Sequence, residues 1–192
     1  MLRRSVWRRA SGVLLALIWM IGAANARDAA EAERPSQQDV EAAYLYNFGK
    51  FVRWPQIAAQ GPLTICVAGR DSMSQEIARL VTGETIEGRP LQVRTPDSAE
   101  RVEGCSILFI GAPQSDRVAE FLSAASGKPV LTVGDTPDFL VRGGMIQFVL
   151  VEDHVRFSVN LAAATHSNLQ LSSELLKVAL AVQGQPGTGG DQ

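Results

Sequence analysis

The sequence has few of the residues on which most catalytic and metal sites depend. It contains two cysteines and two histidines in 192 residues, and neither His154 nor His166 has companions at metal-ligand spacing. It has no Gly-x-Ser-x-Gly nucleophile motif, no Gly-x-x-x-x-Gly-Lys phosphate loop and no dinucleotide-binding glycine motif. We therefore expect no catalytic residue, no cofactor and no metal. A hydrolase would need Asp135, Asp138 and His166 to converge, which a sequence does not show.

An excess of positive charge is also missing. The chain has 18 Lys and Arg against 20 Asp and Glu, a net charge of -2, and its basic residues are scattered beyond the first nine positions. Since phosphate backbones are bound by clustered basic surfaces, this composition excludes a nucleic-acid partner.

Long hydrophobic runs are absent as well. The apolar run from 13 to 21 would rise about 14 Å as a helix, roughly half the thickness of a bilayer core, so it is too short for a membrane anchor. It follows a basic start and precedes Ala24-Asn25-Ala26, the order of parts in a secretory signal peptide. We expect residues 1–26 to be removed. Because that segment holds four arginines and no acid, the exported chain has 166 residues and a net charge of -6, and is periplasmic in a Gram-negative host.

The remainder is expected to hold a flexible lead-in (27–38), one α/β domain (39–183) and a disordered tail (184–192). Helical spacing of apolar residues predicts a helix over 39–54. Alternating strands and helices follow, which predicts a largely parallel sheet with helices on both faces. The last third predicts a β-hairpin with a tight turn at Glu152-Asp153, and then two helices capped by Asn160 and by Ser172 or Ser173, the second of which carries its apolar residues from Leu175 to Leu180. The expected strands are 63–67, 91–94, 106–110, 129–133, 145–151 and 155–159.

Cys66 and Cys105 each lie in or at the entry of a predicted buried strand. In an exported protein such a pair is expected to form a disulfide if the two strands are neighbours. Two separate buried thiols are the alternative.

The predicted first helix carries a cluster of aromatic residues, most of which are expected in the core. Tyr46, Lys50 and Arg53 lie on different arcs from the apolar stripe of Tyr44, Phe48 and Phe51, and so form a candidate recognition face. We add to the partner-binding candidates Trp54, the one tryptophan of the exported chain, and Arg156, on the polar face of the hairpin.

Seven segments, in order, resemble the YfiR family of periplasmic proteins over residues 39 to 181. They are AYLYNFGKFVRWP (43–55), ICVAG (65–69), GRP (88–90), CSILFI (105–110), PVLTV (129–133), GGMIQF (143–148) and VRFSVNL (155–161).

The resemblance implies a regulator. It would bind the periplasmic sensor domain of an inner-membrane diguanylate cyclase and repress it, thereby controlling cyclic di-GMP signalling. An outer-membrane lipoprotein of the OmpA/Pal type would sequester it, and it would form a homodimer. Cys66 and Cys105 match strand-borne cysteine positions of the family, which supports their pairing. A second cysteine pair found in some members is absent, because residues 145–160 contain no cysteine.

A periplasmic small-ligand-binding module, feeding a sensor kinase or an outer-membrane transport system, is the alternative function. Parallel α/β sheets bind ligands beyond the carboxyl ends of their strands. Here that edge would carry Gly69-Arg70-Asp71, Gly111-Ala112-Pro113 and Gly134-Asp135, with Arg70 and Asp135 as candidate ligand contacts.

Overall fold

The computed structural model describes residues 35–55, 59–69 and 71–184. The predicted signal peptide, most of the lead-in and most of the C-terminal tail lie outside these residues. The chain divides into two units, residues 1–36 and 37–192, and the elements below all belong to the second unit.

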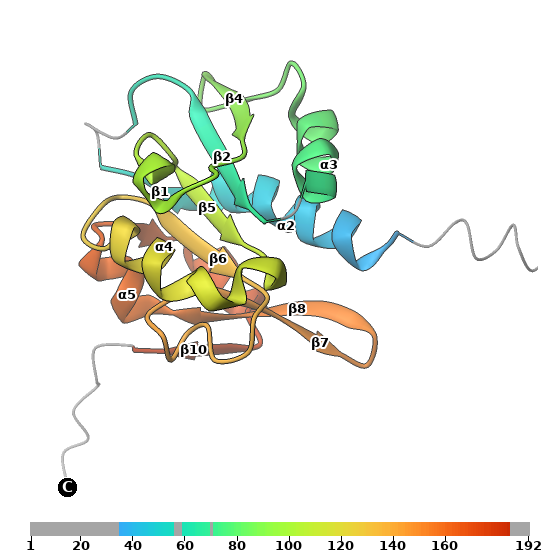
Figure 1. Cartoon of the computed structure of the whole chain (residues 1–192), viewed down its shortest axis with the longest axis vertical. Coiled ribbons are helices and arrows are strands. Elements are labelled where there is room, and N and C mark those ends of the chain that lie inside the picture. The colour runs from blue at the N-terminus through green and yellow to red at the C-terminus, as the bar shows by residue number, and fades with distance from the viewer. Residues whose placement is uncertain (1–34, 56–58, 70, 185–192) are drawn as a thin grey trace, which may run out of the picture. The chain divides into compact units, whose positions relative to one another are not determined.

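The second unit is built on an eight-stranded sheet of order β10-β8-β7-β6-β5-β2-β4-β3 (Figure 1). Its strands are β2 (Leu63–Ala68), β3 (Thr85–Ile86), β4 (Arg89–Arg94), β5 (Ile107–Ile110), β6 (Leu131–Gly134), β7 (Ile146–Val151), β8 (His154–Asn160) and β10 (Ala181–Gln183). β1 (Val52–Arg53) and β9 (Gln170–Leu171) form a separate antiparallel pair. The helices are α2 (Gln37–Phe51), α3 (Asp71–Val81), α4 (Val118–Ala125), α5 (Leu161–His166) and α6 (Ser173–Val178), with 3-10 helices η1 (Ala99–Val102) and η2 (Ala112–Arg117).

The sheet is largely parallel, as predicted. β2 pairs in parallel with β4 and β5, and parallel pairing continues through β6 to β7. β7 and β8 form the predicted antiparallel hairpin. The α/β fold class is therefore confirmed.

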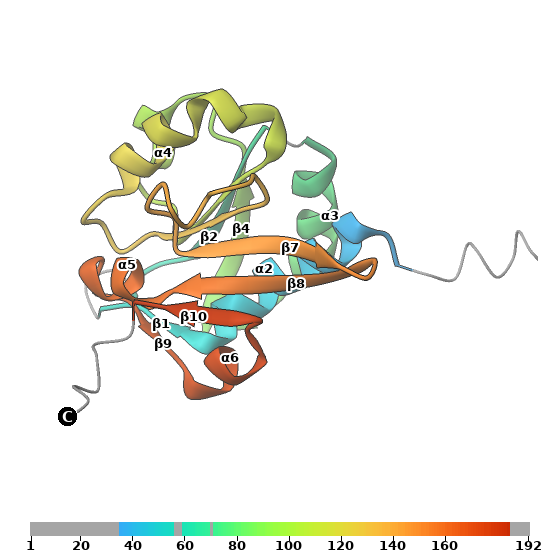
Figure 2. The same cartoon turned by 90° about the horizontal axis from the view of Figure 1, so that it is seen from below.

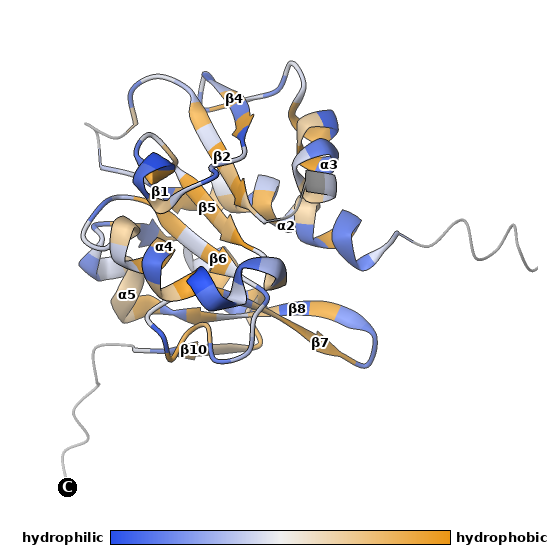
Figure 3. Ribbon diagram, viewed as in Figure 1, coloured by the Kyte–Doolittle hydropathy of each residue, from blue (hydrophilic) through white to orange (hydrophobic). Residues whose placement is uncertain are grey.

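Apolar side chains are buried on both faces of the sheet. In β2, Ile65 and Val67 join a core that includes residues of α2, α3 and α6, while Cys66 and Ala68 join a second core beneath α4 and η1. Figure 2 shows α2 and α4 on opposite sides of the central strands, and Figure 3 shows how apolar β5 and β6 are. Because both faces of β2, β5 and β6 are covered, every residue of these strands is buried, and they are largely apolar, with Thr64 and Thr132 as the polar residues.

The aromatic cluster predicted for the core is largely present. Phe48 packs edge-on against Phe157 at a centroid distance of 5.2 Å, and Tyr44 does the same at 5.4 Å. Phe51 differs from the prediction, because it is 39% exposed. It is the last residue of α2 and lies in a groove between α2 and α6.

Both predicted helix caps near the C-terminus are confirmed. The Asn160 side chain accepts a hydrogen bond from the Ala163 backbone N–H at 3.1 Å, and the Ser172 hydroxyl accepts one from Leu175 at 3.2 Å. These bonds satisfy backbone donors that have no partner within the helix.

Two predicted helices end earlier than expected. The first ends at Phe51 instead of Trp54, because Val52 and Arg53 pair with Leu171 and Gln170. The last ends at Val178 instead of Leu180, where the Leu180 N–H donates to the Phe157 carbonyl at 2.8 Å and the chain enters β10. Helical periodicity continued past both ends, but contacts with distant residues stabilise the extended backbone there.

The hairpin turn between β7 and β8 holds two acidic residues in the left-handed region, Glu152 at φ 49° and Asp153 at φ 60°. Two-residue hairpins with positive φ at both positions favour Asn-Gly or Asp-Gly, because a side chain is strained there. We expect Asp153→Gly to raise the free energy of unfolding by about 0.5 to 1 kcal/mol in urea denaturation. Asp153→Ala is the control, since it removes the same charge but keeps the Cβ. An equal gain from alanine would mean that charge, and not backbone strain, is relieved.

Candidate functional site

Helix α2 presents a polar face on the side away from the aromatic core. Tyr46 and Lys50 are four residues apart and therefore adjacent on this helix. The Lys50 ammonium lies 4.1 Å from the centre of the Tyr46 ring, a cation-π contact.

Glu84, just before β3, and Glu87, in the turn between β3 and β4, complete this face. The Tyr46 hydroxyl donates to Glu84 Oε2 at 3.1 Å, and Arg53 Nη1 lies 3.6 Å from Glu87 Oε1. We call Tyr46, Lys50, Arg53, Glu84 and Glu87 the α2–β3 surface. Three of the predicted partner-binding residues thus belong to one exposed surface with charges of both signs.

Gly49 is the point at which α2 lies closest to this edge of the sheet. A Cβ at Gly49 would lie 2.8 Å from Ile86 Cδ1 and 3.5 Å from Leu63 Cδ1. The helix thus packs directly on side chains of β2 and β3 at this position.

Glu84 and Glu87 were not among the sequence candidates. Glu87 has φ 51° and Gly88 has φ 76°, so a Glu-Gly pair forms the turn of a short hairpin. The Glu-Gly pair, between a Thr-Ile dipeptide and a predicted strand, is the sequence pattern that could have predicted the hairpin. No sequence pattern predicts that Tyr46 and Glu84, which are 38 residues apart in the chain, are in contact.

Trp54 is half-buried beside the α2–β3 surface. It packs against the core, and its indole Nε1 is buried without a hydrogen-bond partner among the described residues. It lines a cleft of about 490 Å³ with Arg53, Asn168 and Gln170.

Arg156 is not part of this surface. It is exposed on β8, opposite Val149 of β7. Its neighbours Val155 and Phe157 point into the core on which α2 packs, so the alternation of side chains places Arg156 on the other face of the sheet. One flat interface therefore does not include both Arg156 and Lys50.

The carboxyl edge of the sheet holds the second set of candidates. Arg70 lies outside the described residues. Asp135 follows β6 and lines a cleft of about 470 Å³ together with Glu41, Gln147 and Leu150. Glu41, which the sequence analysis missed, is fully buried and accepts a hydrogen bond from Gln37 Nε2 at 2.7 Å.

Between the ends of β2 and β5, the chain's own Gln114 covers the position where a ligand was expected. Gly69 has φ 81°, and a Cβ there would overlap the Gln114 side chain. Arg117 Nη1 lies 3.5 Å from Gln114 Oε1 and also donates to the Asp97 carbonyl at 3.3 Å. These contacts hold η2 over the crevice.

Arg117 is itself fixed by Glu120. Its guanidinium donates to both carboxylate oxygens, at 2.9 and 3.0 Å. The hydrogen bond raises the pKa of Arg117 and lowers the pKa of Glu120. The pKa of Glu120 is lower in the folded than in the unfolded chain. The pair therefore stabilises the folded state fully at pH values above the pKa that Glu120 has in the unfolded chain. This contribution is lost as the pH falls through the pKa that Glu120 has in the folded chain.

The residues that a hydrolase would need do not line one cleft. Asp135, Asp138 and His166 line three different clefts. Over the described ranges there is no group of three or more His, Cys, Asp or Glu side chains placed to hold a metal ion. In the same part of the chain, no helix has the length and apolar character needed to span a bilayer.

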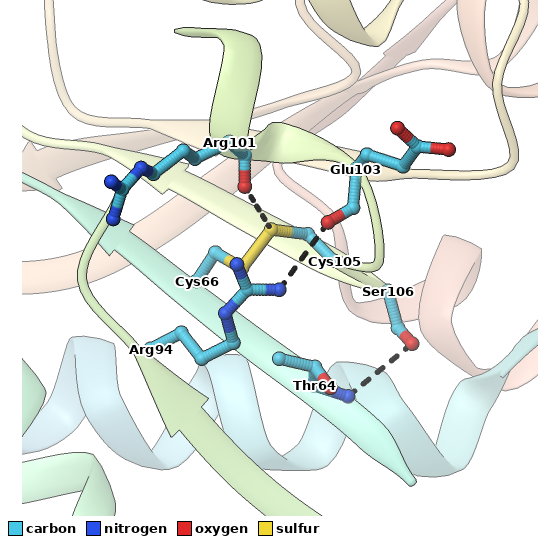
Figure 4. Close-up of a disulfide and its surroundings, with 7 residues drawn as sticks. All are labelled: Thr64, Cys66, Arg94, Arg101, Glu103, Cys105 and Ser106. Atoms are coloured by element: carbon cyan, nitrogen blue, oxygen red, sulfur yellow. Dashed lines mark hydrogen bonds between the residues drawn. A yellow bond between two sulfur atoms is a disulfide. The ribbon is translucent and has the colours of Figure 1, made fainter. Parts of the chain in front are cut away.

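The predicted disulfide between Cys66 and Cys105 is confirmed (Figure 4). The two Cα atoms are 5.7 Å apart. The bridge joins Cys66 in β2 to Cys105, which lies two residues before β5 begins. Ser106 N–H donates to the Thr64 carbonyl at 2.8 Å, and the Ser106 hydroxyl accepts from Thr64 N–H at 3.3 Å. Arg94 Nη1 donates to the Glu103 carbonyl at 3.3 Å beside it.

Among solved structures, the chain is similar to a conserved domain protein from Vibrio cholerae O1 biovar El Tor, with 10% identity and a TM-score of 0.54. The similarity covers 77% of this chain and 60% of the Vibrio protein, so it supports the fold alone. No curated protein was found to match. The model of the YfiR/HmsC-like family matches residues 38–180, well over half of the chain. The chain therefore belongs to the YfiR/HmsC-like family, whose members are periplasmic regulators of cyclic di-GMP signalling.

Proposed function

We propose that this protein binds the periplasmic sensor domain of an inner-membrane diguanylate cyclase and holds the cyclase inactive. The family match over residues 38–180 is the observation that carries this proposal. The family likewise favours release by an outer-membrane lipoprotein of the OmpA/Pal type, and the disulfide is consistent with an oxidising periplasm.

Repression requires that the protein bind the inactive conformation of the sensor more tightly than the active one. Coupling free energies of this kind are typically about 1 to 3 kcal/mol. The disulfide contributes by raising the population of the folded, binding-competent chain.

The α2–β3 surface is the contact that we assign to the sensor. Tyr and Arg are enriched among the residues that dominate binding energies. The ion pair between Arg53 and Glu87 is exposed on both sides, and such pairs contribute little to folding. Exchange of Glu87 for a carboxylate of the partner therefore costs little.

Deleting the gene in its host is expected to raise cyclic di-GMP. Complementation with the wild-type gene should lower it again, whereas the double charge reversal Lys50→Glu, Arg53→Glu should not. In binding assays with the periplasmic sensor domain of a diguanylate cyclase of the host, we expect this variant to lose at least about tenfold in affinity, which is about 1.4 kcal/mol.

Arg156→Glu is the matched control, because it reverses an exposed charge on the opposite face of the sheet. It should bind the sensor and complement like the wild type. An unchanged cyclic di-GMP level after deletion, with the cyclase expressed, would contradict repression. Equal losses for Arg156→Glu and the double variant would contradict the assignment of the surface.

The cleft beside Asp135 favours a second candidate function, the binding of a small ligand. Its volume of about 470 Å³ lies in the range typical of ligand sites. A metabolite bound there would raise the melting temperature of the wild type, and Asp135→Asn would reduce that shift. A screen in which no compound raises the melting temperature would argue against this function.

A further inference from the structure

The cleft beside Asp135 runs along an edge of β7 that none of the described strands covers. The parallel pairing of β6 with β7 ends at Gly134 and Gln147, whereas the antiparallel pairing of β7 with β8 continues to Val151. Figure 1 shows the hairpin of β7 and β8 projecting past the end of β6. We propose that this uncovered edge binds a short extended peptide with a lysine or arginine side chain, and that the peptide pairs with β7 as an added strand.

The register of the hairpin shows which backbone groups of this edge are open. Asn160 N–H donates to the Met145 carbonyl at 2.8 Å, so these two residues form a hydrogen-bonded pair of the antiparallel ladder. Such pairs alternate with non-hydrogen-bonded pairs, and Leu150 opposite Val155 is one of the latter. The N–H and C=O of Leu150 therefore point away from β8, on the side of the cleft that Leu150 lines. Among the described residues, no turn or loop bonds to either group.

The lining of the cleft follows this edge of the strand. Four consecutive residues, 147–150, line it. Because consecutive side chains point to opposite faces of a sheet, such a run marks the edge of the strand and not a face. Past the end of β6, β7 continues from Phe148 to Val151, a length of about 13 Å. This length and the volume of about 470 Å³ suit a free peptide of a few residues better than a long segment of a partner protein.

The charges of the cleft favour a basic peptide. Glu41 of α2 and Asp135, which follows β6, both line the cleft, and none of the described residues that line it is basic. Glu41 is fully buried, and the attraction between opposite charges is stronger where water is excluded. Phe148, Leu150 and Val155 add apolar side chains to the lining. A peptide in which apolar residues flank one basic residue matches both parts of the cleft.

This inference rests on the second function proposed above, the binding of a small ligand beside Asp135, and names the class of that ligand. It does not depend on repression of a cyclase, because the test uses the purified protein alone.

Calorimetric titration of the purified protein with the capped tripeptide acetyl-Val-Lys-Val-amide tests the proposal. The wild type should bind it at one site and approach saturation below about 1 mM. The analogues with glutamine or glutamate in place of lysine should bind at least about tenfold more weakly, because they lack the positive charge. A copy methylated on every backbone nitrogen should lose at least as much, because it keeps the charge but has no donors for the added strand.

Two variants separate the charge from the strand pairing. Asp135→Asn should weaken binding of the lysine peptide at least about tenfold and leave the glutamine analogue unchanged. Leu150→Pro should weaken both peptides, because proline has no N–H, and an outward-facing position of a strand edge tolerates proline. Leu150→Ala is the matched control, since it keeps the N–H, and its affinity for the lysine peptide should stay within about threefold of the wild type. Circular dichroism shows that each variant is folded, and the methylated peptide tests the pairing even if Leu150→Pro is not.

A wild type that does not bind the lysine peptide at 1 mM would overturn the proposal, and so would equal binding of the methylated copy. A twelve-residue peptide with the same core that binds more than tenfold tighter would assign the edge to a segment of a partner protein instead. If Asp135→Asn weakens the lysine peptide while methylation and Leu150→Pro do not, the cleft binds a cation without strand pairing. In that case the inference fails and the small-ligand function stands, as it does if a metabolite acts through Asp135 and every peptide fails.

Discussion

Replacing Cys66 and Cys105 together by alanine is expected to lower the free energy of unfolding by about 4 kcal/mol. The bridge closes a loop of 39 residues, and without it the unfolded chain regains the conformational entropy of that loop. Both cysteines are buried, at 0% and 6% exposure. Their loss also removes packing from the core beneath α4, so the effect should not fall far below this value.

Urea denaturation of the double variant and of the oxidised wild type measures the difference. Reduction of the unfolded wild type should add the mass of two hydrogen atoms, and the reduced chain should lose most of the stability that the variant loses, because its loop is open while its thiols still fill the core. Each single variant should be about as unstable as the double variant, because either change alone opens the loop. A loss below about 1 kcal/mol would contradict a stabilising role for the bridge.

Gly144→Ala is expected to lower the free energy of unfolding by about 3 kcal/mol, because it overpacks the second core. The fully buried Phe139 ring lies between Gly134 and Gly144. A Cβ at Gly144 would overlap that ring and lie 2.8 Å from the Phe139 carbonyl oxygen, which is backbone and does not rotate away. Gly144 is outside the left-handed region, so the cost is steric and not conformational.

Gly49→Ala is the matched control in the same denaturation experiment. Its Cβ would also meet an atom at 2.8 Å, but that atom is the terminal methyl of Ile86, which can move. Alanine is favoured over glycine in a helix by up to about 1 kcal/mol, so this variant should be close to neutral. Equal losses at Gly49 and Gly144 would contradict the distinction between a backbone obstacle and a mobile side chain.

The elements that the sequence predicted well are those whose pattern is local. β2, β5 and β6 are short, largely apolar runs, and α5 and α6 begin at cap residues that bond to their own helices. The pairs β1–β9 and β8–β10 escaped prediction, because strands of two or three residues have no periodicity. They exist only because a distant backbone supplies their hydrogen bonds.

The candidate partner-binding surface was predicted in part for the same reason. Helical spacing places Tyr46 and Lys50 off the apolar stripe of Tyr44 and Phe48, and that depends on α2 alone. The contact of Tyr46 with Glu84, its partial burial against the core, and the position of Gly49 against Ile86 depend on how α2 packs on the sheet. Arg156 was grouped with them because it lies on the polar face of the hairpin. The packing of α2 on the sheet decides that this polar face is the face of the sheet opposite to α2.

The sequence by itself therefore determined the α/β class, the buried strands, the helix caps and the resemblance to one family, since each rests on residue patterns within a segment. The tertiary structure decided that Cys66 and Cys105 are neighbours, that Gln114 covers the crevice above Gly69, and that β7 continues past the end of β6. These features join residues far apart in the chain. Their contacts depend on the packing of whole elements, which no local pattern of residues records.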